Sequence, residues 1–443
     1  MRRVFPRYTY GKGPRASCWW DQTVTASKWP CLDANLNVDV GIVGGGFTGV
    51  SAALTLAEAG VSVALLEANV LGWGASGRNG GFCCLGGGKI SDSELIRRFG
   101  VGGQRDYRAA EVAAVRCVED RLNRYQIDVD RHSEGETQLA HSPRAMAGME
   151  QDAESVLEAY GVEPKVIAAK DLPEVGMGGP FHGAVTLPIG FALNPKKYLL
   201  GLVKVAEAAG ARLFQHSAVL EVVKSGSSIA LKSRSGAVRC STVIMATNGY
   251  SSETIPSDMA GLYMPAQSTI LVTRPLSDDD LAAQGWHSDQ MAYDSRNLLH
   301  YFRLMPDRRF LFGTRGGLMS SPAAEMRARA KARRDFERMF PAWRHVETPN
   351  VWSGMVCLAR NRTPFVGMLP GASGIYAAMA YHGNGVAMGS WAGAQVARLV
   401  LGTSTVQDLP EAIATPMRRF PLGRARRLMM PPAYAAMAVA DLL

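Results

Sequence analysis

The sequence lacks any pair of cysteines spaced as C-x-x-C, and its seven cysteines are an odd number. A disulfide framework normally uses an even number of cysteines, and structural zinc sites use closely spaced pairs. The cysteine pattern therefore argues against both, and we predict no metal site. A chain without disulfides fits a reducing compartment, so we expect a cytoplasmic protein.

Long apolar runs are also missing. No stretch approaches the roughly 20 consecutive apolar residues that a membrane-spanning helix needs. The N-terminus carries positive charge at Arg2 and Arg3, but no apolar run follows, so it does not resemble a secretory signal. We therefore expect a soluble protein that is not transmembrane.

Negative charge is in deficit, because 48 lysines and arginines face 39 acidic residues. Much of the excess lies in two stretches, residues 327–338 and 418–427. Neither stretch is interleaved with aromatic side chains that could stack on bases, so we expect no nucleic-acid partner. The stretches are either solvated helix faces or a contact surface for a membrane or an acidic partner.

A glycine-rich turn lies between a strand and a helix near the N-terminus. Residues 38–43 have the pattern of a buried strand, and residues 44–49 follow with the spacing G-x-G-x-x-G. A second strand over residues 62–66 ends at Glu67. The glycines allow a pyrophosphate to approach the N-terminus of the helix, and the carboxylate can accept hydrogen bonds from the adenosine ribose. The unit predicts dinucleotide binding rather than a purely structural turn.

A second glycine-rich loop, residues 72–81, comes shortly after Glu67. A loop with so few side chains exposes backbone N–H groups and lets a ligand approach closely. It indicates a second cradle, for the pyrophosphate and flavin end of FAD, although a flexible lid is the alternative. A single NAD-binding domain has no use for this loop or for the distant return to an α/β pattern at residues 375–401. We therefore expect FAD.

The α/β pattern comes in three pieces with mixed segments between them. The expected fold class is α/β plus α+β: a Rossmann-type FAD-binding domain with an inserted substrate domain built on a mixed antiparallel sheet. Among single elements we expect helices over 94–99 and 104–125 and a strand over 218–223. The expected organisation is an N-terminal arm (1–36), a discontinuous FAD-binding domain (37–98, 194–260 and 350–410), a substrate domain (99–193 and 261–349) and a basic C-terminal tail (411–443).

Several motifs together resemble the D-amino-acid oxidase/glycine oxidase superfamily of flavoenzymes, over nearly the whole chain. They are the glycine turn at 44–49, Glu67, the block 74–81 and the C-terminal turn His382-Gly383-Asn384-Gly385-Val386. The order of segments 297–304, 312–313 and 352–354 is similar to that of the γ-glutamylputrescine oxidase branch. The resemblance implies a two-domain flavoprotein that binds FAD in an extended conformation and oxidises a carbon–nitrogen bond.

The resemblance also implies which residues hold FAD. Members of the superfamily bind it through both glycine loops, the acid after the second strand, the backbone at the position of Val219 and the C-terminal turn. The expected cofactor-binding residues are Gly44, Gly46, Phe47, Thr48, Gly49, Glu67, Ala68, Gly74, Ala75, Ser76, Gly77, Arg78, Asn79, Gly80, Gly81, Val219, Thr247, Asn248, Gly249, Gly354, Gly383, Asn384, Gly385, Val386 and Met388.

Four further residues are candidates for handling the substrate. Tyr301 and Arg303 alternate to one face of a strand, and an inward-facing Arg303 could hold a carboxylate bidentately. Alternatively, Arg303 is paired to an acid at the sheet rim. Trp352 could form an apolar wall beside the flavin or belong to the core, and His382 could tune the flavin, contact substrate or only support the turn. Paired acid–base residues are not evident, as expected where the cofactor performs the difficult step.

The chain departs from its relatives at two places. Some relatives attach FAD covalently through a histidine in the loop that Arg78 and Asn79 occupy here, and sarcosine oxidases use a cysteine near the position of Met355. Cys357 is about two residues out of register, so we expect noncovalent FAD. Sarcosine oxidases also carry an oxygen-activating lysine where this chain has Leu311, which argues against O2 as the acceptor unless Arg78 or Arg303 replaces that charge.

The sequence therefore predicts oxidative deamination of a small amine or amino acid, with a γ-glutamylputrescine-like compound as the leading substrate. Hydride passes from the C–H next to nitrogen to flavin N5, the imine is hydrolysed, and O2 takes the electrons. The main alternative is a dehydrogenase that passes electrons to a quinone or a carrier protein, with the basic tail as docking surface. A flavin-binding protein without turnover is a third, less favoured interpretation.

Overall fold

The computed structural model describes residues 1–25, 27–315 and 317–441. Its first large sheet has six strands in the order β19-β20-β13-β2-β3-β9. All neighbours pair in parallel except β19, which is antiparallel to β20. The strands are β2 (Val40–Val43), β3 (Val63–Leu66), β9 (Arg212–Phe214), β13 (Thr242–Met245), β19 (Phe365–Met368) and β20 (Ile375–Met379).

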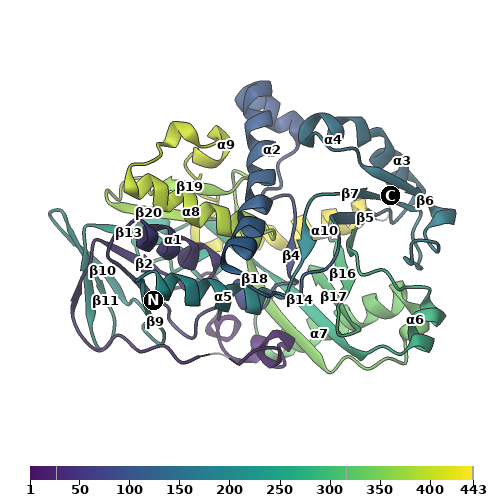
Figure 1. The fold of residues 1–443 in the computed structure, drawn as a ribbon, viewed down its shortest axis with the longest axis horizontal. Helices are drawn as coiled ribbons and strands as arrows, with labels where there is room; N and C mark the ends of the chain where they lie inside the picture. The colour runs from purple at the N-terminus through teal and green to yellow at the C-terminus, as the bar shows by residue number, and fades with distance from the viewer. Residues whose placement is uncertain (26, 316, 442–443) are drawn as a thin grey trace.

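Three helices cover one face of this sheet (Figure 1). Helix α1 (Phe47–Glu58) packs against both α5 (Pro195–Ala208) and α8 (Ala387–Leu401). The other face carries a smaller sheet in the order β1-β12-β11-β10. Its strands are β1 (Leu36–Asn37), β10 (Glu221–Ser225), β11 (Ser228–Lys232) and β12 (Ala237–Cys240). Because both faces are covered, the central strands are apolar throughout.

A second large sheet of eight strands lies beside the first, with the long helix α2 (Asp92–Tyr125) between them (Figure 1). Its order is β18-β14-β17-β16-β15-β5-β7-β6. A cluster of aromatic rings, including Phe302, Phe310 and Phe312, packs its outer face against α7 (Pro322–Met339). The strands are β5 (Glu136–Leu139), β6 (Lys165–Ala168), β7 (Gly183–Leu187), β14 (Tyr263–Pro275), β15 (Met291–Asp294), β16 (His300–Leu304), β17 (Arg309–Arg315) and β18 (Asn350–Ala359).

The remaining elements are short or peripheral. A two-stranded sheet joins β4 (Phe82–Cys83) to β8 (Phe191–Ala192). Within the described ranges, no helix combines the length and apolarity needed to span a membrane. The other helices are α3 (Pro143–Gln151), α4 (Ala153–Tyr160), α6 (Asp278–Gln284), α9 (Glu411–Ala414) and α10 (Met430–Ala440).

The expected combination of a Rossmann-type fold and a mixed, largely antiparallel sheet is confirmed. The two helices expected over 94–99 and 104–125 form one helix, α2, which is kinked at Gly100, where φ is 73°. Strand β10 begins at Glu221, not at residue 218. The domain boundaries stay a prediction; β18, which opens the segment 350–410, pairs with β14 in the eight-stranded sheet.

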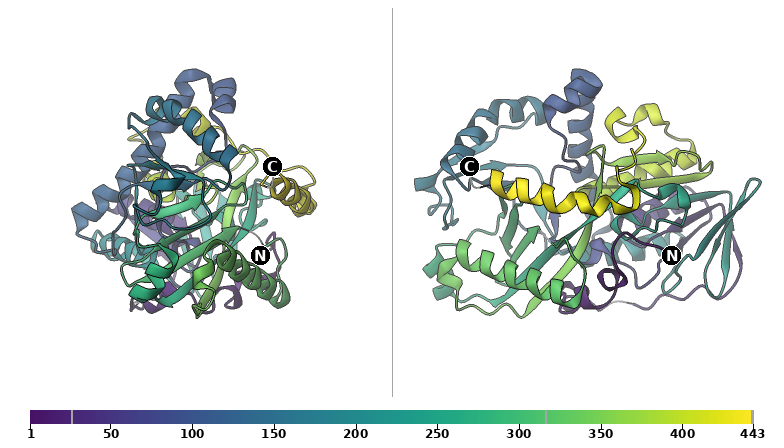
Figure 2. Two further views of the ribbon diagram at one scale, coloured as in Figure 1. Left: turned by 90° about the vertical axis from the view of Figure 1, so that its right-hand side faces the viewer. Right: turned by 180° about the vertical axis from the view of Figure 1, so that it is seen from behind.

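The two charged stretches have different settings. Residues 327–338 lie in α7, where Ala332 and Phe336 are buried and most of the arginines face outward. Residues 418–427 precede α10, which crosses the surface on the side seen from behind (Figure 2). No residue of α10 is charged, and most of its side chains are exposed. It ends beside Asp441, whose carboxylate accepts N–H bonds from Asn297 and Leu298.

Candidate active site

The turn between β2 and α1 requires glycine for the backbone itself. Gly44 has a φ of 112°, and a Cβ on Gly49 would collide with the carbonyl oxygen of Gly44. Gly46 is the N-cap of α1 and provides no side-chain cap. Apart from the Phe47 N–H, which donates to Ser76 Oγ at 2.9 Å, the first N–H groups of the helix are available to an anionic ligand.

Glu67 lies at the end of β3, beside this turn. Its Oε2 accepts a hydrogen bond from the Gly45 N–H at 2.9 Å, and its Oε1 accepts one from the Asn69 N–H at 2.8 Å. Burial raises the pKa of the carboxyl group, while these two hydrogen bonds oppose the rise. Each carboxylate oxygen keeps a further lone pair, so Glu67 can hold the loop and also accept ribose hydroxyl groups.

A cleft runs from the glycine turn to the C-terminal turn, and most of the expected cofactor residues line it. Gly49, Gly77 and Gly81 lie behind its wall, where a Cβ would collide with the carbonyl oxygens of Gly44, Gly72 and Leu193. Gly249 and Met388 line neither this cleft nor the second cavity, which is lined by Arg78, Gly80, Gly354 and Asn384. The expected residues in the cleft are Gly44, Gly46, Phe47, Thr48, Glu67, Ala68, Gly74, Ala75, Ser76, Asn79, Val219, Thr247, Asn248, Gly383, Gly385 and Val386.

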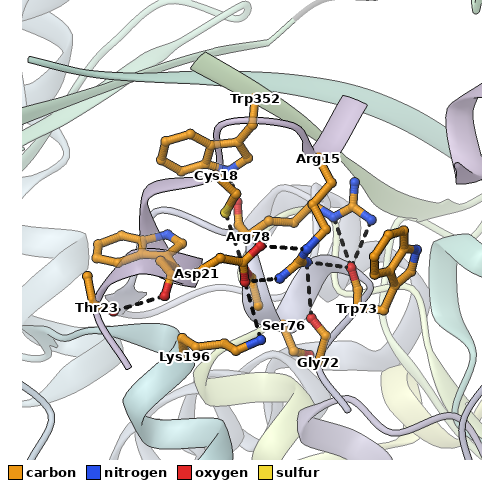
Figure 3. Close-up of polar contacts among 12 residues, drawn as sticks. Arg15, Cys18, Asp21, Thr23, Gly72, Trp73, Ser76, Arg78, Lys196 and Trp352 are labelled. Atoms are coloured by element: carbon orange, nitrogen blue, oxygen red, sulfur yellow. Dashed lines mark hydrogen bonds and ion pairs between the residues drawn. The ribbon is translucent and has the colours of Figure 1, made fainter. Parts of the chain in front are cut away.

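The second glycine loop is held by the N-terminal arm (Figure 3). Arg15 donates to the carbonyl oxygen of Trp73 at 2.8 Å, and the Trp20 indole N–H donates to that of Asn79 at 2.7 Å. Asp21 forms an ion pair with Arg15, and the Lys196 ammonium lies 3.4 Å from the same carboxylate. These contacts fix the backbone of a loop that has few side chains of its own.

Arg78 braces the same loop against β18. Its guanidinium donates to the carbonyl oxygens of Trp73 at 2.8 Å and Ser353 at 3.0 Å. Its own carbonyl oxygen accepts a hydrogen bond from the Trp352 indole at 2.8 Å. The N–H donors of Arg78 are thus bonded to backbone carbonyl oxygens, and burial lowers the pKa of its guanidinium.

The C-terminal turn carries His382, which lines the cofactor cleft and is 4% exposed. Its Nε2 accepts a hydrogen bond from the Ala359 N–H at 3.2 Å, so the ring proton resides on Nδ1. Burial, reinforced by repulsion from Lys89 and Arg315, lowers the pKa of His382 to about 3. The imidazole is therefore neutral and fixed in one tautomer.

The second cavity, of about 680 Å³, adjoins the cleft beneath the eight-stranded sheet. Tyr301 lines it, with its hydroxyl 3.1 Å from Ser268 Oγ and its ring against Phe82. The cavity and the cleft share a boundary, so a ligand in one can contact a ligand in the other. The shared residues are Ala75, Asn79, Met355, Val356, Gly383 and Val386.

Two cations face this cavity next to the C-terminal turn. Arg315, the last residue of β17, donates to the carbonyl oxygen of His382 at 3.3 Å, and a Cβ on Gly383 would lie 2.6 Å from its Nη2. Its Nε has no partner, and Arg315 forms no ion pair with any described residue. Loss of surrounding water lowers the pKa of Lys89 to about 8, and repulsion from Arg315 adds to this effect. The pair offers unsatisfied positive charge to an anionic group.

The structure places Arg303 and Trp352 away from both cavities. The Arg303 guanidinium is buried, where it donates to the carbonyl oxygen of Leu193 at 2.8 Å and contacts His132 Nε2 at 2.9 Å. Burial lowers its pKa to about 9. Trp352 is fully buried against Trp20. Tyr301 and Arg303 do share a face of β16, but that face extends past the end of the cavity.

Arg315 and the N-terminal arm are features of the candidate site that the sequence alone did not predict. The register of the sheet pairs Arg315 with Ser268, whose hydroxyl contacts Tyr301. This pairing, together with that of Gly313 with Tyr301, brings Arg315 to the same end of the sheet as Tyr301. The sequence contains a weak signal for it, because Arg315 lies just after the segment 312–313 that resembles the γ-glutamylputrescine oxidase branch.

Comparison with known families matches residues 39–399 to the model described as FAD dependent oxidoreductase. The chain belongs to this family. It is 30% identical over 408 residues to gamma-glutamylputrescine oxidoreductase of Escherichia coli, which covers 90% of this chain and 91% of that protein. It is 29% identical over 404 residues to the probable oxidoreductase OrdL of Haemophilus influenzae, with 90% and 91% coverage.

Solved structures of the same fold include glycine oxidase from Geobacillus kaustophilus, with a TM-score of 0.67 at 20% identity over 84% of this chain and 96% of that one. L-proline dehydrogenase from P. horikoshii also has a TM-score of 0.67, at 18% identity over 84% and 95%. The protein is an FAD-dependent oxidoreductase enzyme, and FAD is its cofactor. The glycine turn, the available helix N–H groups and Glu67 fit this cofactor.

Replacing Glu67 by Gln should weaken FAD binding in this family member by about 1–2 kcal/mol, because hydrogen bonds to a charged acceptor become neutral ones. Fluorescence titration of the apoprotein with FAD measures the dissociation constant. An unchanged dissociation constant would show that Glu67 only stabilises the loop, through its hydrogen bonds with Gly45 and Asn69, and does not contact FAD.

Proposed function

We propose that the enzyme oxidises the carbon–nitrogen bond of a small amine or amino acid that carries a carboxylate, with γ-glutamylputrescine-like compounds as the leading candidates. The observation that supports this most directly is the Arg315 guanidinium, which faces the cavity without an anionic partner. Its position beside the C-terminal turn puts it next to the cofactor cleft. The name of the Escherichia coli relative, gamma-glutamylputrescine oxidoreductase, agrees with such a substrate.

In the proposed reaction, Arg315 and Lys89 bind the substrate carboxylate. They thereby orient the rest of the substrate toward the boundary that the cavity shares with the cofactor cleft. A guanidinium and an ammonium in a partly water-excluded cavity provide a strong anion site. Tyr301 and Phe82 form an apolar wall beside it. FAD supplies the acceptor for the hydride that leaves the carbon next to the neutral amine nitrogen. The resulting imine is then hydrolysed.

The electron acceptor in this proposal is O2, and a dehydrogenase with a quinone or carrier acceptor is the second candidate. The exposed, uncharged α10, which follows the exposed Arg418, Arg419 and Arg424, favours this second candidate because it could dock such an acceptor. Leu311, where sarcosine oxidases have a lysine, is fully buried and brings no charge. The ratio of turnover with O2 to turnover with an artificial dye distinguishes the two candidates.

The binding of FAD is proposed to be noncovalent, in a reducing cytoplasmic compartment. All seven cysteines are free thiols. Cys357 lines the cofactor cleft, but burial raises the pKa of its thiol, which makes it a poor nucleophile. Acid precipitation should release the yellow colour into the supernatant. Colour retained in the pellet would contradict noncovalent binding.

The proposed reaction is tested by anaerobic reduction of the holoenzyme. A panel of γ-glutamylated amines, polyamines, amino acids and simple amines is mixed with the enzyme without oxygen. Carboxylate-bearing amines should bleach the flavin absorbance faster than simple amines of the same length. If no amine or amino acid in the panel bleaches the flavin, the proposed function is wrong.

A further inference from the structure

Glu136 is a buried carboxylate in the wall of the substrate cavity. It begins β5, is 4% exposed and faces the cavity from the strand next to β15. Its Oε1 accepts a hydrogen bond from the Leu85 N–H at 3.1 Å. No ion pair joins Glu136 to any residue in the described part of the chain. A carboxylate so far removed from water normally has a cationic partner.

The neighbours of Glu136 do not provide that partner. Glu111, from α2, repels it, and Glu111 is itself satisfied by Arg108 at 2.7 Å and by the Tyr160 hydroxyl at 2.8 Å. The hydroxyl of Tyr293, from β15, also lies close to Glu136 but carries no positive charge. Burial, followed by repulsion from Glu111, raises the pKa of Glu136 to about 8. None of these neighbours is a cation, and a cationic ligand beside Glu136 would favour the ionised form of its carboxyl group.

Glu136 lines the same cavity as Arg315 and Lys89, and Leu85 connects it to the C-terminal turn through two hydrogen bonds. The Leu85 N–H donates to Glu136, while the Leu85 carbonyl oxygen accepts a hydrogen bond from Asn384 Nδ2 at 2.5 Å. One residue thus connects Glu136 to the C-terminal turn, whose His382 carbonyl oxygen holds Arg315. Among the charged residues that line the cavity, Arg108 is paired with Asp92 and Glu111, whereas no ion pair is formed by Arg315, Lys89 or Glu136 within the described part of the chain. Such a cavity is complementary to a zwitterion.

We infer that Glu136 binds an ammonium group of the substrate while Arg315 and Lys89 bind its carboxylate. The substrate class is then a zwitterionic compound whose ammonium and carboxylate groups are held apart, beyond what the family assignment specifies. This inference rests on the proposed function, because it concerns the same cavity. It makes Glu136 the residue that separates zwitterionic substrates from simple carboxylates.

The inference is tested with two non-reacting probes, ε-aminocaproate and caproate, which differ only in the ammonium group. Binding to the FAD-loaded enzyme is followed by calorimetry and by perturbation of the flavin absorbance. At about pH 8.5 the carboxyl group of Glu136, whose pKa is about 8, is largely ionised and the ammonium of the probe is still protonated. Because the pKa of Lys89 is also about 8, Arg315 supplies most of the positive charge for the probe carboxylate at this pH. The enzyme should bind ε-aminocaproate at least about ten-fold more tightly than caproate, the usual scale for a charge-assisted hydrogen bond.

The variant Glu136→Gln keeps the size of the side chain and should remove this preference while leaving caproate binding unchanged. Arg315→Gln should weaken the binding of both probes. Glu134→Gln is the matched control, because Glu134 is exposed, lines neither cavity and lies two residues away; it should retain the full preference. FAD content and thermal unfolding of each variant confirm that it is folded.

Two outcomes would overturn the inference: equal affinity of the unmodified enzyme for both probes, including failure to bind either, or a preference that persists in Glu136→Gln. Neither outcome bears on whether amines reduce the flavin, which the anaerobic panel measures separately. If zwitterions bind as inferred but no amine bleaches the flavin, the proposed function fails and the assignment of Glu136 stands.

Discussion

Replacing Arg315 by Ala should lower kcat/KM for carboxylate-bearing substrates by about 30-fold or more. A charge-assisted pair in a water-poor cavity contributes roughly 2–5 kcal/mol, and its loss appears directly in kcat/KM. Arg315 has no competing anionic partner among the described residues, so its full interaction is available to the substrate. Steady-state kinetics with paired substrates, with and without the carboxylate, provides the measurement.

The loss should be small for simple amines, and Arg315→Lys should restore only part of it, because a point charge cannot reproduce the fork of a guanidinium. Arg303→Ala is the informative comparison. Its guanidinium is buried against Leu193 and His132, so its removal should lower the thermal unfolding temperature without selecting between substrate types. Equal losses on both substrate types in Arg315→Ala would remove Arg315 from the proposed carboxylate site.

Replacing Gly46 by Val should abolish FAD binding while the chain still folds. The added Cβ would meet only the Ser76 hydroxyl, which can rotate away, but the branched side chain would fill the space that a pyrophosphate needs at the N-terminus of α1. The expected product is colourless protein with a normal circular dichroism spectrum. Its FAD content is read from absorbance after denaturation.

Gly49→Val is the comparison variant for Gly46→Val, because a Cβ at position 49 would collide with the Gly44 carbonyl oxygen inside the turn. This variant should fail to fold, and added FAD should not rescue it. A yellow Gly46→Val protein with full FAD occupancy would refute the assignment of the glycine turn to the cofactor.

The cofactor half of the fold could be predicted because its signals are local. Strand, glycine turn, helix and Glu67 follow one another within a single βαβ unit, so spacing alone determines their arrangement. The substrate half could not be predicted to the same depth. Alternation along β16 correctly put Tyr301 and Arg303 on one face, but where the cavity ends along that face depends on how eight strands pair.

The proposed role of Arg315 in binding the substrate carboxylate illustrates this difference. Arg315 reaches the cavity because β17 pairs with β16, its neighbour in sequence, and with β14, whose register with β17 no local pattern reveals. The sequence did not predict Glu136 as a site residue for the same reason. Its proposed role depends on Leu85 and Tyr293, which are distant from it in sequence. Long-range pairing, rather than side-chain chemistry, was the missing information.

The clamp that the N-terminal arm forms on the second glycine loop has a consequence for biosynthesis. Arg15 and Trp20 leave the ribosome early, yet their partners lie in residues 72–79, and Asn350, which donates to the Ser17 carbonyl oxygen, is made far later. Until then the indole rings of the arm have no pocket and are exposed to non-native contacts. We expect the nascent chain to depend on chaperones until β18 has emerged. Cofactor loading should accordingly follow completion of synthesis.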